Sequence, residues 1–367
     1  MKTIKTEVIR IDNEKIEAEI IAHTAKVLKS GGIVVIPTDT VYGLACDAYN
    51  QKTIKRIFKI KKRAPQKSLI LFCKREEISS LTSEIPLSAQ KLMERFFPGP
   101  LTIILKASPV LPRWLVSKNG TVGIRLPQQS FVLTLLEKFH SPLATTSANL
   151  SGRGEPKSIE EVITNFWGKV ELILDAGSSQ KTSPSTVIDL TREPAVILRK
   201  GEISKNLLEE TIGEKIKLER ITVLFICTGN TCRSPLAQGY FQKIIPLKMK
   251  NRLIVISAGT AAVDGLPAAE YTQQVGLEQG FDLSRHRTRL LTDSLIKETD
   301  LIFAMESKHI EEILSIVPEA SEKTFLLKQG GEISDPIGQP LEVYRQVFEE
   351  IKENIPLALE RINQLLY

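Results

Sequence analysis

The residue best suited to covalent chemistry is a cysteine at the end of an apolar run. Cys227 follows Ile221–Ile226, and Arg233 and Ser234 stand six and seven positions later. A loop between a strand and a helix points backbone N–H groups inward, and the helix dipole adds positive potential, so such a loop binds anions. A thiol beneath these groups and beside an arginine should ionise well below its usual pKa of about 8.5. We therefore expect Cys227 to be a nucleophile and Arg233 to bind a phosphoryl group.

The residues between and beside these two suit a phosphate-binding loop. Glycine and asparagine tolerate the unusual dihedrals of a tight loop, and Pro235 suits the first turn of a helix over 236–245. Attack on phosphorus would give a phosphocysteine, with the guanidinium on two equatorial oxygens and Ser234 donating to the departing sulfur. The residues expected to bind phosphate or set specificity are Thr228, Gly229, Asn230, Thr231, Cys232 and Ser234.

This reaction also needs an acid for the leaving atom. Asp335 precedes Pro336, which fixes a turn, and is the candidate acid and later the base for the attacking water. The sequence has no CxxC pair or histidine cluster of the kind that binds zinc. We expect the phosphatase reaction to need no cofactor.

Polar residues in the first half cluster at the ends of expected strands and helices, where ligands bind in α/β sheets. Neither GxxxxGK[ST] nor GxGxxG is present, so a Walker or Rossmann site has no support. Cations, hydroxyls and an amide nevertheless suggest a triphosphate site; the alternative is that 59–67 is a solvated helix face. The candidate ATP-binding residues are Lys61, Arg63, Lys67, Thr121, Ser147, Asn149 and Arg199.

The elements that must position these residues indicate two domains. A chain of 367 residues exceeds what one hydrophobic core usually organises. Strand-like runs alternate with helical stretches in both halves, which predicts the α/β class. A strand over 195–199 ends the first half, and a charged, helix-prone stretch follows it. We expect a first domain over 1–203, a linker over 204–219 and a second domain over 220–367.

Composition narrows the class of protein. With 42% hydrophobic and 25% charged residues the chain has ordinary globular usage. Its apolar runs fall short of the ~20 residues of a membrane helix, and its first ten residues do not resemble a secretory signal. We expect a cytoplasmic protein without a membrane partner. The net charge of +6 is spread along the chain and identifies no single partner. Cys46 and Cys73 lie in strand-like surroundings and are expected to be buried structural thiols.

The second half resembles the low-molecular-weight protein tyrosine phosphatases from about residue 219 to 367. The resemblance rests on 227–234, 257–260, 283–286 and 335–336. It implies a parallel-sheet domain acting on phosphoproteins. Thr231, where tyrosine-specific relatives carry a bulkier apolar residue, is similar to the protein-arginine phosphatase branch and favours phosphoarginine, with phosphotyrosine second. Cys232 resembles a second loop cysteine able to form a reversible disulfide with the nucleophile, and Ile337 departs from the aromatic residue common after Asp-Pro.

The first half resembles the threonylcarbamoyl-AMP synthases over residues 4–203. The matching blocks are 37–44, 97–102, 120–125, 147–152, 185–187 and 197–199, whereas Phe72 replaces a common histidine. The resemblance implies a YrdC-like twisted α/β sheet that condenses L-threonine, bicarbonate and ATP for tRNA N6-threonylcarbamoyladenosine formation, with tRNA or a tRNA-modification complex as a partner. Mg²⁺ would be bound only through ATP. The implied threonine-binding residues are Thr40, Arg125, Thr145 and Ser185.

Two alternatives stay open. The first half could be an RNA-binding module that contacts phosphates, although few aromatic residues lie near its basic blocks. The second half could be a phospho-binding or redox-sensing domain without turnover. Intact Cys227, Arg233 and Asp335 argue against that second alternative.

Overall fold

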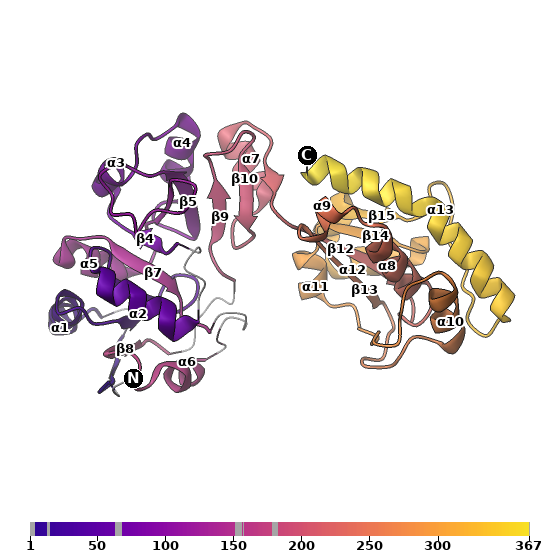
Figure 1. Cartoon of the computed structure of the whole chain (residues 1–367), viewed down its shortest axis with the longest axis horizontal. Coiled ribbons are helices and arrows are strands. Elements are labelled where there is room, and N and C mark those ends of the chain that lie inside the picture. Colours follow the sequence, from indigo (N-terminus) through magenta and orange to yellow (C-terminus); the bar gives the residue numbers. More distant parts are fainter. Residues whose placement is uncertain are drawn as a thin grey trace. The chain divides into compact units, whose positions relative to one another are not determined.

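The chain forms two compact units, residues 1–217 and 218–367, each of which is described by itself. The computed structural model describes residues 4–12, 15–62, 68–150, 156, 158–177 and 183–366. Figure 1 labels the elements along the chain. No helix in these described ranges has both the length and the hydrophobicity needed to cross a bilayer.

The first unit is built on a mixed sheet whose order is β1-β8-β2-β3-β7-β4-β6-β5-β9-β10-β11. The pairs β1–β8, β2–β8, β4–β6 and β5–β9 are parallel, whereas β2–β3, β3–β7, β4–β7, β5–β6 and β9–β10 are antiparallel. The strands are β1 (Glu7–Arg10), β2 (Val34–Ile36), β3 (Gly43–Asp47), β4 (Ile70–Phe72), β5 (Leu101–Lys106), β6 (Thr121–Arg125), β7 (Leu143–Ser147), β8 (Leu172–Asp175), β9 (Thr186–Asp189), β10 (Val196–Arg199) and β11 (Lys217–Leu218).

Amphipathic helices pack on this sheet through one apolar face each. In α1, for example, Ile21, Ala25 and Leu28 recur at helical spacing and are all buried. The helices of the unit are α1 (Ala18–Lys29), α2 (Gln51–Lys61), α3 (Ile78–Leu81), α4 (Leu87–Phe96), α5 (Ser130–Phe139), α6 (Ile159–Phe166) and α7 (Lys205–Ile212).

The stretch proposed as a linker, 204–219, has a defined structure. Ser204 caps α7 by accepting from the backbone of Leu207. Helix α7 packs against α4, and Arg95 of α4 lies 3.1 Å from the carboxylate of Glu210. Strand β11 then follows at the edge of the sheet. Residues 204–217 are thus packed into the first unit.

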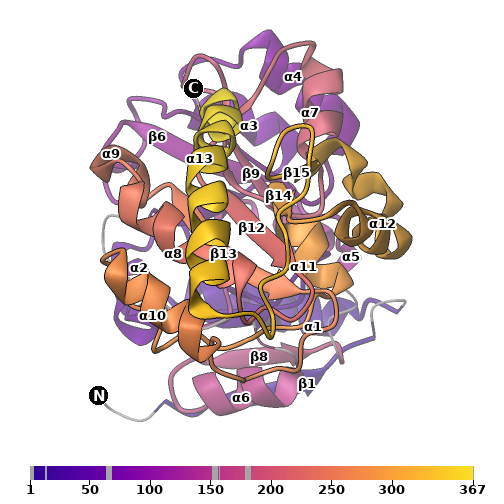
Figure 2. The same cartoon turned by 90° about the vertical axis from the view of Figure 1, so that its right-hand side faces the viewer.

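The second unit has a parallel sheet in the order β13-β12-β14-β15. Helices α8 and α13 lie together on one face, as Figure 2 shows, and bury Phe225, Phe241, Phe303 and Phe348. The opposite face holds a second cluster that includes Leu224. The elements are β12 (Ile221–Cys227), β13 (Leu253–Gly259), β14 (Leu301–Ala304), β15 (Thr324–Leu326), α8 (Arg233–Ile244), α9 (Leu247–Lys250), α10 (Glu270–Glu278), α11 (Asp293–Glu298), α12 (Ser307–Ile316) and α13 (Leu341–Leu366).

The predicted fold class is confirmed: both units are α/β, and the second has a parallel sheet. The predicted strand before Cys227 is β12, and the predicted helix after it is α8, which begins three residues earlier than expected, at Arg233.

Candidate active sites

The loop of the second unit lies between β12 and α8, at the carboxyl end of a central strand of the sheet. Cys227 is the last residue of β12 and is 3% exposed, and Arg233 is the first residue of α8 and is 1% exposed. Residues 228–232 therefore wrap between a strand end and a helix N-terminus, the arrangement expected to bind an anion.

Asn230 shapes this loop. It has a φ of +56°, in the left-handed region that asparagine tolerates, and it is fully buried. Its amide nitrogen donates to the hydroxyls of Ser234 and Ser257, both at 2.9 Å, and its Oδ1 accepts from the backbone N–H of Arg289. Its carbonyl also lies 2.8 Å from Nε2 of His286. The Asn230 side chain thus braces the loop from within the protein.

Glycine has a different role here from the expected one. Gly229 is absent from the positive-φ glycines of the described chain, so the turn depends on Asn230. The tight approach is at Gly259 of β13, where a Cβ would lie 2.4 Å from the carbonyl oxygen of Thr228 and 2.8 Å from the nitrogen of Asn230. Gly259 lets the neighbouring strand support the loop closely, a role that the sequence analysis missed.

The sulfur of Cys227 contacts a hydroxyl. Its Sγ lies 3.0 Å from Oγ of Ser234. Because Asn230 donates to this hydroxyl oxygen, the hydroxyl hydrogen can point at the sulfur, as the sequence analysis expected.

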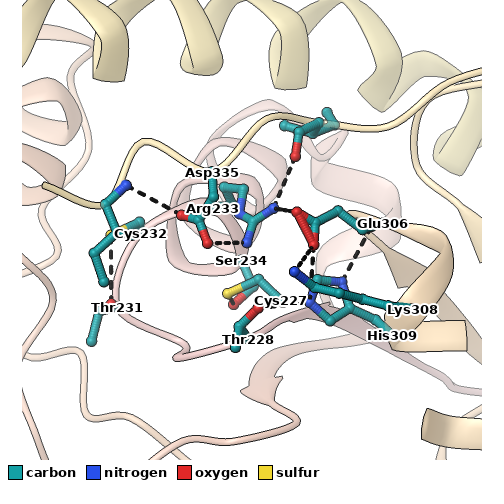
Figure 3. A network of polar contacts seen from close by, with 12 residues as sticks. Cys227, Thr228, Thr231, Cys232, Arg233, Ser234, Glu306, Lys308, His309 and Asp335 are labelled. Carbon is teal, nitrogen blue, oxygen red and sulfur yellow. Dashed lines mark hydrogen bonds and ion pairs between the residues drawn. The ribbon is translucent and has the colours of Figure 1, made fainter. Parts of the chain in front are cut away.

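Arg233 is held by two carboxylates and a carbonyl (Figure 3). NH1 donates to Glu306 Oε1 at 2.8 Å and to the carbonyl of Ile333 at 2.9 Å, and NH2 donates to Oδ2 of Asp335. Its Nε is buried and has no hydrogen-bond partner in the described part of the chain. The structure thus brings Cys227, Arg233 and Asp335 into one site and adds Glu306, which the sequence analysis missed.

The expected acidity of the nucleophile is wrong for this arrangement. Burial raises the pKa of the Cys227 thiol and outweighs the hydrogen bonds from Ser234, the charge of Arg233 and the backbone of Asn230, which lower it. The sequence revealed these stabilising groups and Asp335, but it did not reveal the depth of the thiol or the pairing of Glu306 and Asp335 with Arg233.

A buried histidine supports the same loop. His309 Nδ1 accepts from the backbone N–H of Glu306 at 3.2 Å, so in the neutral ring Nε2 carries the hydrogen. That nitrogen lies 2.9 Å from Oγ1 of Thr228 and donates to it. Burial lowers the pKa of His309, which favours the neutral form of the ring. Thr228 is thereby left with its own hydroxyl hydrogen to donate.

Thr231 and Cys232 are two of the residues predicted to bind phosphate or set specificity. The Oγ1 of Thr231, a half-buried residue, lies 3.5 Å from the sulfur of Cys232. Cys232 is buried, and its sulfur lies 3.6 Å from the hydroxyl of Tyr344, which stacks edge-on with Tyr271. All four cysteines are free thiols, and burial raises the pKa of Cys46 and Cys73, as expected of structural thiols.

In the first unit, strand register places the predicted residues on one face of the sheet. Gly123 pairs with Ile70, which pairs with Thr145. Because side chains alternate between faces, residues two positions away share the face of their neighbours. Thr121 and Arg125 on β6 therefore share a face with Thr145 and Ser147 on β7.

A small cavity of about 90 Å³ opens between several of these residues. Tyr42 and Phe72 form part of its wall. Its lining includes five of the predicted residues, namely Thr40, Thr145, Ser147, Ser185 and Arg199.

Two hydrogen-bonded groups stand at this cavity. Arg199 donates from Nε to the carbonyl of Ser185 at 3.0 Å and from NH2 to its hydroxyl at 2.8 Å. Lys61 is 1% exposed, and its ammonium donates to the carbonyl of Ser147 and to Oδ1 of Asn149, the latter at 2.9 Å. Hydrogen bonds thus hold the guanidinium of Arg199 and the ammonium of Lys61 in fixed positions.

The remaining predicted residues lie elsewhere. Thr121 begins β6, level with Ser147 but two strands away, and its hydroxyl contacts Ser117 at 2.7 Å. Arg63 and Lys67 lie outside the described residues. Arg125 donates from NH1 to Oγ1 of Thr40 at 3.2 Å. It also pairs with Asp39, a residue that the sequence analysis did not select.

Comparison with known proteins assigns both units. Residues 26–201 match the Sua5_yciO_yrdC family, described as Telomere recombination, and residues 222–365 match the low molecular weight phosphotyrosine protein phosphatases. A relative of the first unit from Methanocaldococcus jannaschii is 32% identical over 202 residues, and the chain covers 95% of its length. The chain belongs to the Sua5/YrdC family and carries a low-molecular-weight phosphatase domain.

The relatives of the Sua5/YrdC domain include longer proteins. The threonylcarbamoyl-AMP synthase of Pyrococcus abyssi is 41% identical over 202 residues, which are 55% of this chain and 59% of that protein. The chain thus spans little more than half of that relative's length. A solved structure of a P. abyssi Sua5 variant is 34% identical, covers 60% of this chain and 71% of that chain, and has a TM-score of 0.55.

The phosphatase domain also aligns with a solved structure. The YwlE arginine phosphatase from Geobacillus stearothermophilus is 37% identical over 39% of this chain and 94% of that chain, with a TM-score of 0.36. The assignment of this domain rests on the family match over 222–365.

Proposed function

We propose that the chain is a bifunctional enzyme whose first unit makes L-threonylcarbamoyladenylate from L-threonine, bicarbonate and ATP, for tRNA modification. The observation that supports this activity best is the polar cavity at the end of β7, lined by Thr40, Thr145, Ser185 and Arg199. Its size suits a small amino acid, and fixed cations adjoin it. The family of the unit points to the same chemistry.

The proposed roles follow from the donor types. Arg125 takes the carboxylate of threonine, and the hydroxyls of Thr40, Thr145 and Ser185 fix its polar groups. Lys61 and Arg199, with Thr121, Ser147 and Asn149, bind the ATP phosphates. These groups are mainly hydrogen-bond donors, so they suit phosphate oxygens, and Mg²⁺ would be carried by ATP. The threonine carbamate attacks the α-phosphorus, a step that needs positioning and charge neutralisation rather than a protein nucleophile.

A direct assay tests this activity. Purified chain is incubated with ATP, Mg²⁺, L-threonine and bicarbonate, and the acyl-adenylate and pyrophosphate are measured. Pyrophosphate release that requires both threonine and bicarbonate supports the proposal. RNA binding that weakens steeply with salt, with no pyrophosphate release, would instead support the RNA-binding alternative.

The second unit is proposed to dephosphorylate phosphoproteins through a phosphocysteine on Cys227. The observation that carries this proposal is the buried Nε–H of Arg233, which has no partner among the described residues, whereas its other nitrogens are already engaged. Buried donors without partners are rare and costly, so this N–H is poised to bind an anion such as a phosphoryl oxygen. Asp335 would protonate the leaving atom, and Ser234 would stabilise the departing sulfur.

Phosphoarginine is the preferred substrate in this proposal, with phosphotyrosine second. Thr231 supports it, because among the described residues its hydroxyl has only the weak sulfur contact with Cys232 and can hydrogen-bond a guanidinium. An apolar side chain there would pack better on a phenyl ring.

Matched phosphopeptides test the preference. We expect the wild type to hydrolyse the phosphoarginine peptide faster and Thr231→Ile to reverse the order, with Thr231→Ser keeping it. An unchanged order in Thr231→Ile would refute the specificity assignment. Phosphopeptide binding without turnover by the wild type would favour the silent-domain alternative.

A further inference from the structure

Arg125 and Asp39 form a buried ion pair in the first unit. NH2 of Arg125 lies 2.6 Å from Oδ1 of Asp39, and the side chains are only 5% and 10% exposed. The other contacts of Arg125 run from Nε to the carbonyl of Gly99 at 3.1 Å and from NH1 to Oγ1 of Thr40 at 3.2 Å. A guanidinium has five N–H groups, so one hydrogen on each terminal nitrogen is not used by these contacts.

The second oxygen of Asp39 is unusual. Its Oδ2 is buried and has no hydrogen-bond partner among the residues that the structure describes. Burying a carboxylate oxygen without a hydrogen-bond donor costs free energy, which is why buried polar atoms in proteins are nearly always paired. Thr38 and Thr40, the neighbours of Asp39, both line the cavity. Asp39 and Arg125 are not themselves among its lining residues, but Arg125 donates to Oγ1 of Thr40, which is. The ion pair therefore lies directly behind the wall of the site proposed for threonine.

The charges of the pair are complementary to those of an amino acid. A carboxylate brought to Arg125 would also approach Asp39, and like charges at short distance repel. That repulsion is offset when the ligand carries a positive group one carbon away from its carboxylate, as the α-ammonium of an amino acid is. The ligand then presents a negative group to Arg125 and a positive donor to Asp39.

We propose that Oδ2 of Asp39 binds the α-ammonium of L-threonine while Arg125 binds its carboxylate, so that this pair selects an α-amino acid. The inference rests on the synthase function proposed above and adds a specificity residue to it. When the nitrogen becomes a carbamate it loses its positive charge but keeps one N–H. The interaction is therefore strongest with bound threonine, and its loss raises KM for threonine more than it lowers kcat.

Two ligands and one substitution test the role. Binding of L-threonine and of (R)-3-hydroxybutyrate, the same molecule without its amino group, is measured by calorimetry or ligand-observed NMR on the full chain. We expect Asp39→Asn to weaken threonine binding by about 10-fold or more, the scale of a hydrogen bond between charged groups. Binding of 3-hydroxybutyrate should stay the same or tighten, because the repulsion is removed.

A matched control is Asp47→Asn on β3, where Asp47 Oδ1 accepts from the backbone N–H of Tyr49, a bond that an asparagine oxygen can keep. It should leave both affinities unchanged. If Asp39→Asn does not fold, as judged by circular dichroism, Asp39→Glu retains the charge and should keep a measurable preference for threonine.

Other outcomes would overturn the inference. An equal loss of affinity for both ligands in Asp39→Asn would mean that Asp39 only orients Arg125. An equal gain would mean that Asp39 obstructs the site. A wild type that binds no threonine and makes no acyl-adenylate would instead contradict the synthase function itself, so the two failures are distinguishable.

Discussion

NH1 of Arg233 lies 2.8 Å from Oε1 of Glu306, and this pair of a buried and a half-buried side chain joins residues that are 73 positions apart in the chain. Asp335 binds the other terminal nitrogen of the same guanidinium. The ammonium of Lys308 pairs with the other oxygen of Glu306. Two carboxylates thus share two cations beside the nucleophile, and both bind the guanidinium of Arg233. The resulting site holds its phosphate-binding group in place but stabilises the thiolate of Cys227 less than an unpaired arginine would.

Replacing Glu306 by glutamine should make Cys227 more acidic. The substitution removes one negative charge from the site while an amide oxygen can still accept from Arg233, so the guanidinium stabilises the thiolate more strongly. We expect iodoacetamide to alkylate Cys227 severalfold faster at pH 7 in Glu306→Gln, as measured by mass spectrometry of the peptide that contains it. Glu311→Gln, at an exposed position of α12, the helix whose N-cap is Glu306, is the control. Equal rates in the two variants would show that Glu306 does not modulate the sulfur.

Asp335→Asn should slow turnover in a way that depends on the leaving group. Without its acid, the enzyme should lose about 10²- to 10⁴-fold in kcat/KM on phosphopeptides, whose leaving atoms need a proton. This ratio reports formation of the phosphocysteine and excludes its later hydrolysis, in which Asp335 is the proposed base. The loss should be much smaller on p-nitrophenyl phosphate, whose leaving group departs as a stable anion. Stopped assays on both substrates give the comparison. The same loss on both would assign Asp335 to orienting Arg233 rather than to proton transfer.

Acid should destabilise the second unit through His309. Burial lowers the pKa of this histidine from 6.5, so the folded state binds its proton less readily than the unfolded state does. The stabilisation is complete above about pH 6.5 and is lost as the pH falls below that value toward the lowered folded pKa, at up to 1.36 kcal/mol per pH unit. His286, whose pKa burial also lowers, acts in the same direction.

The measurement is the rate of thermal inactivation of phosphatase activity at pH 7.5 and pH 5.5. We expect His309→Gln to be less stable at pH 7.5 by about 1 kcal/mol, because a buried hydrogen bond is lost. Its difference between the two pH values should be smaller than that of the wild type. A pH dependence as steep as the wild type's would assign the effect to other groups.

The loop of the second unit was predictable because its signals are local. An apolar run, a residue that tolerates a positive φ at 230 and a proline in the following turn all lie within fifteen residues, and they gave β12 and α8 nearly to their observed bounds. The partners of the key side chains were not predictable in this way. Asp39 and Arg125 are 86 positions apart, and Glu306 carries no motif that marks it as a partner of Arg233.

The prediction of a low pKa for the Cys227 thiol was wrong for a related reason. The sequence shows that an arginine and a serine stand near the thiol, but it does not show how deeply the fold buries the sulfur. Desolvation disfavours the charged form and depends on every element packed around the site. In the first unit, residue order likewise suggested a common sheet edge, whereas the alignment of Thr121 with Ser147 needed the observed pairing of β6, β4 and β7.

Gly259 has no side chain, and this affects how the phosphate-binding loop can move. The carbonyl of Thr228 and the nitrogen of Asn230 occupy the space that even a methyl group would need there. The curvature of the anion-binding loop over 228–232 is therefore set by strand β13 as much as by the loop's own residues. If this loop adjusts to a larger or smaller anion, strand β13 has to shift with it.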